Sequence, residues 1–193
     1  MSYTRVSVKK PSNNAGRPKG KAGYIMLFPW VDVEKYERDD KGVKVDEFKL
    51  KDAFKPIGVY ATPSTQNMYH EVSGEGDATG FIHHVAFSHP GDSLAFSEFV
   101  ENNTNVPLGA ILIPCQGDDC RIAGLPCNGL KITQDTGQAN NEATKHDLEL
   151  VQEFAGPVLG HISKALVPAT EDNDINAELG LPYPGSSAGS GGI

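Results

Sequence analysis

The stretch Leu108-Gly-Ala-Ile-Leu-Ile-Pro114 decides the fold, because it opens a region in which short apolar runs alternate with turn residues up to Val167. Short apolar runs bounded by Gly, Pro, Asn or Asp are typical of β-strands rather than helices. We therefore expect a mainly β protein, a β-sandwich or half-barrel protomer with one short flanking α-helix and flexible terminal arms. The strands expected in this region are residues 108–113, 120–123, 129–134, 144–154 and 157–165.

The strand expected at residues 144–154 has one apolar and one acidic face. Its apolar set is Leu148, Leu150 and Phe154, and its acidic set is Asp147, Glu149 and Glu153. Because successive side chains of a strand point to opposite faces, the pattern predicts a half-buried antiparallel strand with carboxylates on its outer face. Asp147, Glu149 and Glu153 are called the outer-face acids below.

Upstream of Leu108 the patterns are shorter. Phe96, Phe99 and Val100 lie at helical spacing after Asp92 or Ser93 as N-cap, which predicts a short amphipathic helix over about 93–102. The dense charge of residues 32–56 indicates either an exposed hairpin or a long loop. Further strands are expected at 23–28, 57–61 and 81–87.

Charge is unevenly distributed along a chain whose formal net charge is −8. Residues 65–193 hold 17 acidic and four basic residues, whereas the first 31 residues hold six basic residues and no acidic one. Binding of nucleic acid by the body is not expected, because a phosphate-binding face needs clustered Lys and Arg. The six basic residues of the first segment are expected to contact acidic surfaces of neighbouring subunits, and DNA binding is the alternative. These residues are Arg5, Lys9, Lys10, Arg17, Lys19 and Lys21.

Composition divides the chain into a body and two terminal segments. Residues 1–22 and 166–193 are expected to be flexible arms, since Gly, Pro, Ser, Asn and charged residues dominate them. The body is expected to span residues 23–165 as one domain. No apolar run approaches the length of about 18 residues that indicates a transmembrane helix, and no apolar segment of a Sec signal follows the early Lys pair.

Three cysteines form the most suggestive cluster for chemistry. Cys115, Cys120 and Cys127 are separated by four and six residues, whereas structural zinc sites use four ligands and closer pairs. The favoured interpretation is a hairpin at 116–119 flanked by buried thiols in a reducing compartment.

The remaining candidates for catalysis or metal binding are also weak. His83 and His84 would face opposite sides of a strand, which prevents joint ligation of a metal. Ser88-His89 is only a sequence neighbour pair, and Asp118-Asp119 lies in a turn, where Asp is favoured for backbone hydrogen bonding. We expect no catalytic, cofactor-binding or metal-binding residues, and no cofactor.

The order of the elements resembles that of a known family. The parts that carry the resemblance are the Pro90-Gly91 turn before the helix, the strand 109–116, and the segment Phe154-Ala155-Gly156-Pro157 between the last strands. Over about residues 23–165 the chain is similar to tail tube proteins of long-tailed bacteriophages, in particular those of phages infecting Bacteroidetes-type hosts.

The resemblance implies a structural virion protein that assembles into stacked, hexameric rings around a lumen through which DNA passes. Its partners would be copies of itself and other tail proteins, and genomic DNA would pass without specific binding. The expected location is the virion tail, assembled in the host cytoplasm, without a membrane. The outer-face acids would line the lumen, because carboxylates repel phosphates.

Three alternatives remain open from the sequence. The protein could occupy another virion position, as a head-decoration, neck or tail-terminator protein. It could be a carbohydrate-binding β-sandwich module, although Trp30 is the only Trp for an aromatic platform. It could also be a small metalloenzyme that uses the cysteines and a histidine.

Overall fold

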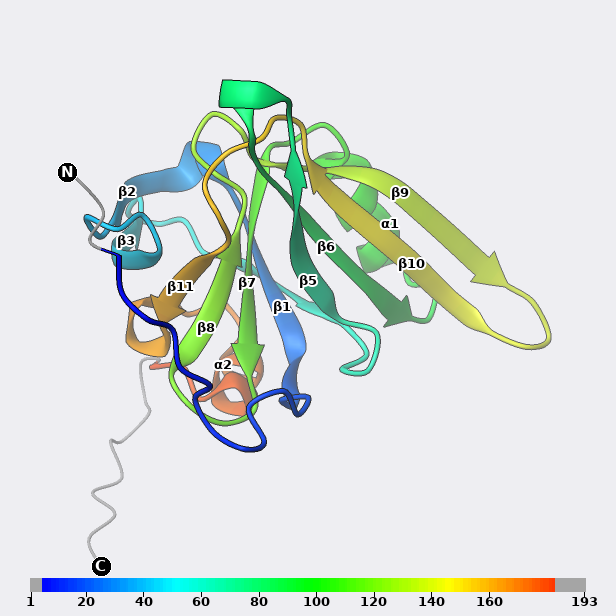
Figure 1. Ribbon diagram of the computed structural model, residues 1–193. Coiled ribbons are helices and arrows are strands. Elements are labelled where there is room, and N and C mark those ends of the chain that lie inside the picture. Colours follow the sequence, from blue (N-terminus) through cyan, green and yellow to red (C-terminus); the bar gives the residue numbers. More distant parts are fainter. Residues whose placement is uncertain (1–4, 183–193) are drawn as a thin grey trace, which may run out of the picture.

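The computed structural model describes residues 5–182, and within this range the chain is mainly β (Figure 1). Eleven strands, two α-helices and three 3-10 helices follow one another as β1 (Lys21–Pro29), η1 (Trp30–Asp32), β2 (Val33–Arg38), β3 (Lys44–Leu50), β4 (Ile57–Tyr60), β5 (Asn67–Ser73), η2 (Gly76–Ala78), β6 (Gly80–Pro90), α1 (Leu94–Asn103), β7 (Leu108–Pro114), β8 (Asp119–Ala123), β9 (Leu130–Ala139), β10 (Thr144–Gln152), β11 (Gly160–Ser163), η3 (Lys164–Leu166) and α2 (Asn173–Leu179).

All described strands belong to one branched sheet. Its main path runs β2-β3-β11-β8-β7-β9-β10-β6-β5, while β1 branches off β7 and pairs with β4. β7 and β9 share a single pair, Leu108 with Leu130, so the sheet divides at this point. The large half contains β2, β3, β11, β8, β7, β1 and β4, and the small half contains β9, β10, β6 and β5.

β1 and β7 lie at the centre of the fold, with both faces buried. In β1, Ile25 and Leu27 belong to one hydrophobic core, whereas Met26 and Phe28 belong to another. Because alternate side chains point to opposite faces, these strands separate the two cores. This position explains why their sequences are continuous apolar runs rather than alternating patterns.

The first core lies between the two halves of the sheet, which gives the fold its sandwich character. β6 and β10 contribute its wall in the small half: Val85, Phe87, Leu148 and Leu150. α1 packs against it through the buried Phe96 and the partly buried Phe99 and Val100. The Ser93 hydroxyl accepts a hydrogen bond from the Phe96 backbone N–H, so Ser93 is the N-cap.

The second core lies on the other face of the large half. The β2–β3 hairpin folds over it with Val45, Phe48 and Leu50, and the end of α2 closes it with Leu179. The charged segment 32–56 therefore contains a hairpin, as one of the two interpretations expected, but one face of this hairpin is buried rather than exposed. Its turn follows Asp39, whose carboxylate accepts the backbone N–H groups of Val43 and Lys44 at 2.8 and 3.0 Å.

The predicted mainly β fold with a short flanking helix is confirmed, but three details differ from the sequence patterns. β5 was not expected, because its residues are exposed and lack an apolar run. Within the expected flexible tail 166–193, residues 173–179 form α2, which is capped by Asp172 and packs on β1. Residues 183–193 lie outside the described range.

Phe154 is the third difference. It was expected to share the buried face of Leu148 and Leu150, yet its side chain is 63% exposed. β10 ends at Gln152, so the alternation no longer applies two residues further on. Gln152, rather than Phe154, is the next buried residue after Leu148 and Leu150 on the inner face of β10.

Candidate assembly surface

The small half of the sheet presents an outer face that nothing in the described chain covers. Residues paired across neighbouring strands share a face, and the register pairs Asp147 with Ser88, Glu149 with Ala86, and Tyr69 with His84. The adjacent residues Leu148 and Val85 point into the first core. The outer face thus carries Asn67, Tyr69, Glu71, His84, Ala86, Ser88, Lys131, Gln134, Thr136, Lys145, Asp147, Glu149 and Val151.

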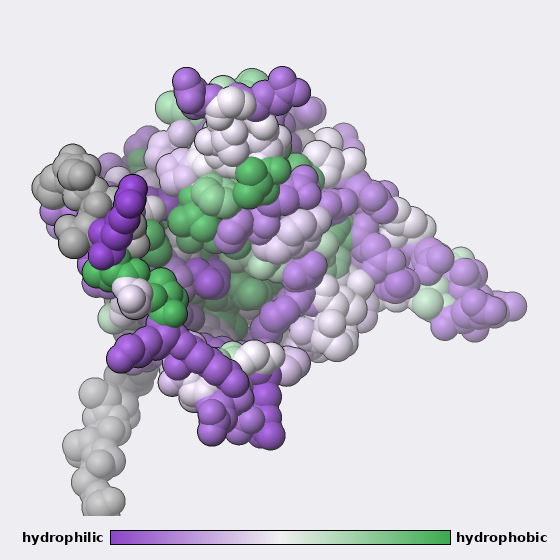
Figure 2. Space-filling view, in the orientation of Figure 1, coloured by the Kyte–Doolittle hydropathy of each residue, from purple (hydrophilic) through white to green (hydrophobic). Residues whose placement is uncertain are grey.

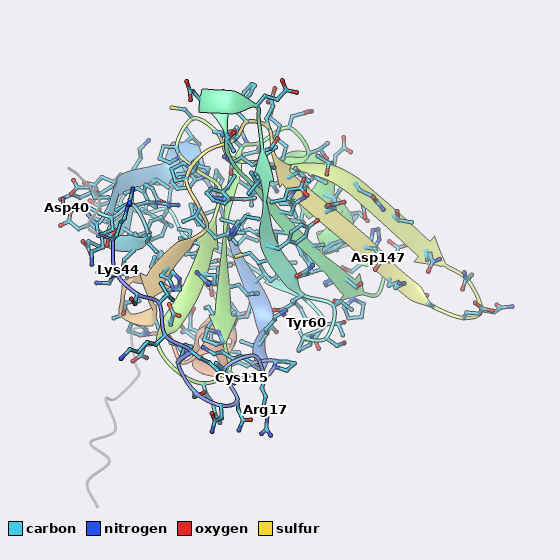
Figure 3. All side chains as sticks on the ribbon, in the orientation of Figure 1. Arg17, Asp40, Lys44, Tyr60, Cys115 and Asp147 are labelled. Carbon is cyan, nitrogen blue, oxygen red and sulfur yellow. The ribbon has the colours of Figure 1, made fainter. Side chains whose placement is uncertain are left out.

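Asp147 and Glu149 lie on this face as the alternation predicted, and Figure 3 shows Asp147 on β10. Asp147 forms an ion pair with Lys145 at 2.7 Å and accepts a hydrogen bond from the Ser88 hydroxyl. The Lys145 contact, followed by the Ser88 hydrogen bond, lowers the pKa of Asp147 below its ordinary value. Asp147 is therefore an ionised group with a local counter-charge.

The other two outer-face acids also have basic neighbours. Glu149 lies 3.4 Å from Nδ1 of His84, and Glu153 lies 2.9 Å from Nζ of Lys131. Glu153 follows the end of β10 and is placed by this contact rather than by strand alternation. Glu153 thus has a counter-charge on β9 and Glu149 has a polar neighbour on β6, and the pattern of the 144–154 segment alone revealed neither contact.

An aromatic pair lies near the middle of the outer face. The rings of Tyr69 and His84 stack at a centroid distance of 4.6 Å and an interplanar angle of 7°. Nε2 of His84 is 3.3 Å from the Glu71 carboxylate. Close by, Ser88, Gln134 and other residues line a shallow groove of about 240 Å³. The face therefore combines one aromatic ring with several carboxylates and amides.

The β9–β10 hairpin extends beyond the body (Figure 1) and its surface is largely hydrophilic (Figure 2). At its tip the Asn140 side chain accepts the backbone N–H groups of Glu142 and Ala143 at 2.8 and 2.9 Å. Nearer the body, Nδ1 of His146 contacts Asp135 at 3.0 Å and Nε2 contacts Asp92 at 3.4 Å. His146 thus connects the hairpin to the turn before α1.

The basic arm is shorter than its composition indicated. Lys21 belongs to β1, and its Nζ donates to the Gln66 carbonyl, so it is part of the body. Arg17 and Lys19 border a groove of about 300 Å³ together with Arg121 of β8. Figure 3 places Arg17 near Cys115, at the bottom of the molecule in this view.

The first described residues of the arm are the most exposed. Residues 5–20 contain no helix or strand. Val6 and Val8 are 65% and 93% exposed, and the basic residues next to them are exposed as well: Arg5, Lys9 and Lys10. Val6 and Val8 therefore contact little of the described body.

The three cysteines do not converge. Cys115 follows β7 and Cys127 follows β8, and because these strands are antiparallel the two residues lie beyond opposite ends of the pair. Cys120 is buried in the second core, where burial raises the pKa of its thiol to about 11. A neutral, enclosed thiol is a packing residue, and no metal-binding cluster of three or more His, Cys, Asp or Glu occurs among residues 5–182.

The histidines of β6 take the separate faces that the alternation predicted. His83 is fully buried, and its ring accepts the Gly124 backbone N–H through Nδ1 at 3.1 Å. Its Nε2 donates to the Pro157 carbonyl at 2.8 Å. His83 therefore joins the small half to two segments that flank the large half, a role that the sequence did not indicate.

His161 of β11 contacts two charged residues of β8. Nδ1 of His161 is 2.7 Å from the Asp119 carboxylate, and Nε2 meets the Arg121 guanidinium. A guanidinium can only donate, so Nε2 accepts and Nδ1 carries the proton given to Asp119. Both ring nitrogens are occupied, and the cluster fixes neighbouring strands.

None of the helices between residues 5 and 182 has the length and apolar character needed to cross a bilayer. Comparison of the chain with protein-family models, with curated proteins and with solved structures gave no match.

Proposed function

We propose that the chain is a structural protein of a virion, a tail tube subunit that assembles with copies of itself into stacked rings for DNA passage. The observation that carries the proposal is the small half of the sheet. It ends in the uncovered strand β5, exposes one polar face and extends the β9–β10 hairpin beyond the body. Uncovered strand edges pair readily with other chains, and ring closure removes them.

The charge of the outer face suits a conduit for DNA. Four carboxylates on or beside it stand against two lysines: Glu71, Asp147, Glu149 and Glu153 against Lys131 and Lys145. A net negative surface repels phosphates, so a strand of DNA would slide without binding. The same capacity for self-association would also serve a head-decoration, neck or tail-terminator protein.

Electron microscopy of the purified full chain tests this proposal directly, with sedimentation velocity over a wide concentration range beside it. Tubes or stacked rings are expected at high concentration. A single monomeric species at every concentration and salt would contradict a structural role in rings. A head-decoration or neck protein would give closed rings that do not stack.

A carbohydrate-binding module is the second candidate, and Tyr69 favours it. Tyr69 is 37% exposed on the outer face, and its ring stacks on that of His84, which contacts both Glu71 and Glu149. An aromatic ring beside carboxylates can stack on a sugar and accept its hydroxyl groups. Titration with a panel of soluble oligosaccharides, using Tyr69→Ala as the matched variant, separates this function from assembly.

A further inference from the structure

β5 is the one edge strand of the described sheet that lacks protection. β2, at the opposite end, has two register irregularities and carries Lys35. β9 has a bulge in its pairing with β10 and carries Lys131, while β4 has only four residues. Lysines, bulges and short strands are the usual devices that prevent edge-to-edge pairing.

β5 has no lysine, no bulge and no shortening, and Glu71 is its only acidic residue. It is seven residues long, pairs with β6 without a register shift, and contains no Lys, Arg or Pro. Within residues 5–182 no hydrogen bond from outside β6 reaches its backbone. The backbone N–H and C=O groups on its outer side are therefore available to another strand.

The two faces of β5 differ in character. Tyr69 and Glu71 point to the outer polar face, whereas Met68 and Val72 point to the inner side, where Val72 remains 66% exposed. Residues 67–80 contain three acidic residues and no Lys or Arg. A matching strand would therefore be basic on one face and apolar on the other.

The arm has this pattern. In Arg5-Val-Ser-Val-Lys9 the odd positions are polar or basic and the even positions are Val6 and Val8. If the segment lies beside β5 as a strand, one face places either Arg5 or Lys9 opposite Glu71, depending on the register, and the other places the valines beside Val72. No other described stretch combines exposed alternate valines with basic residues only.

We propose that residues 5–10 of one copy add as a strand to the edge of β5 in a second copy. This inference rests on the proposed self-assembly and names the surface that it uses. The arm would bury Val6 and Val8, cover the unprotected edge, and place its positive charge against the acidic 67–80 segment. Strand addition supplies main-chain hydrogen bonds, and the alternating side chains set the register.

Charge reversal tests the pairing in the full-length chain. Arg5→Glu with Lys9→Glu on the arm, or Glu71→Lys on β5, places like charges opposite each other. Each variant is expected to raise the concentration for half-maximal association up to about tenfold, because one partly exposed ion pair becomes a repulsive contact. The chain with all three changes restores opposite charges and is expected to associate near the original concentration.

A backbone test is independent of charge. Val8→Pro removes one backbone donor and disfavours pairing, whereas the matched control Val8→Thr keeps strand propensity. We expect Val8→Pro to weaken association and Val8→Thr to leave it nearly unchanged. Val8 is exposed in the single chain, so circular dichroism should give the same thermal midpoint for the two variants.

The outcomes separate this inference from the proposed function. If the original chain forms rings and neither charge reversal nor Val8→Pro changes their formation, the arm does not pair with β5, and assembly uses other surfaces. If the original chain never associates, both ideas fail. If the arm variants lose only low-salt retention of DNA in a gel-shift experiment, the arm binds nucleic acid and the pairing is refuted.

Discussion

His83 should make the stability of the protein depend on pH between about 6.5 and 4. The perturbation is His83→Gln, compared with the original chain over this range. Burial lowers the pKa of His83 to about 4, below the ordinary 6.5, and this effect outweighs the contact with the Pro157 carbonyl. The folded protein therefore keeps the ring neutral where the unfolded chain takes up a proton.

The magnitude follows from this difference in pKa. One unit corresponds to about 1.4 kcal/mol, so the full effect is about 3 kcal/mol. Because the folded pKa is the lower one, the stability is fully present above pH 6.5. It is lost as the pH falls toward 4, with a slope of at most about 1.4 kcal/mol per pH unit. A loss of this size is a large part of the usual stability of a domain.

Urea unfolding followed by the fluorescence of the buried Trp30 measures the effect. Gln retains an amide donor for Pro157 and an oxygen acceptor for Gly124, but it does not titrate. His83→Gln should cost about 1–2 kcal/mol at pH 7.5 and should flatten the dependence on pH. His70→Gln is the matched control, because His70 is an exposed residue of the neighbouring strand β5.

Carboxylates of the whole chain also titrate near pH 4, so only the difference between the variant and the original chain is informative. If His83→Gln keeps the same slope between pH 6.5 and 4.5 as the original chain, the buried neutral ring is not the cause. If His70→Gln removes the slope, the effect belongs to the surface rather than to the His83 bridge.

Three further predictions concern the hairpin, the C-terminal helix and the outer face. Burial lowers the pKa of His146, but hydrogen bonds to Asp135 and Asp92 raise it more, so the net pKa of His146 is raised. The stability that this shift contributes is present below pH 6.5 and is lost as the pH rises through the folded pKa. An NMR titration should show a lower pKa of His146 in Asp135→Asn. Leu179→Ala should cost about 2–5 kcal/mol in thermal unfolding, because the side chain is 1% exposed in the second core; no change would mean that α2 is detached in solution. Replacing the three outer-face acids by Lys should leave the circular dichroism spectrum unchanged and create salt-sensitive DNA binding in a gel shift; retention of DNA by the original chain at the same salt would refute the proposal of a repelling face.

Local patterns identified most of the strands because they depend on nearby residues. Buried residues recur in the sequence with a period of 2 in strands and 3.6 in helices. This periodicity predicted the apolar runs of β1 and β7, the alternation around Leu148 and the capped helix at 94–103. β5 was missed because an exposed edge strand needs no apolar run. α2 was missed because its seven residues follow Asp and Asn, and Leu179 is its main buried contact.

The candidate surface was predictable only in part. Alternation placed Asp147 and Glu149 on one face, but the neighbours of Glu149 and Glu153 come from other parts of the chain. Lys131 and His84 lie 22 and 65 residues away from Glu153 and Glu149. Spacing along one segment carries no information about such neighbours, which depend on strand order and register.

An acidic, mainly β protein with a basic segment before the first strand follows from the residues alone, because composition and periodicity need no information on tertiary contacts. Tertiary structure alone decided which edge is unprotected, which carboxylates have counter-charges, and which histidine is buried. These properties follow from pairings between distant strands, such as β6 with β10 and β3 with β11. Their register is set by the burial of two cores at once, and no single segment contains that information.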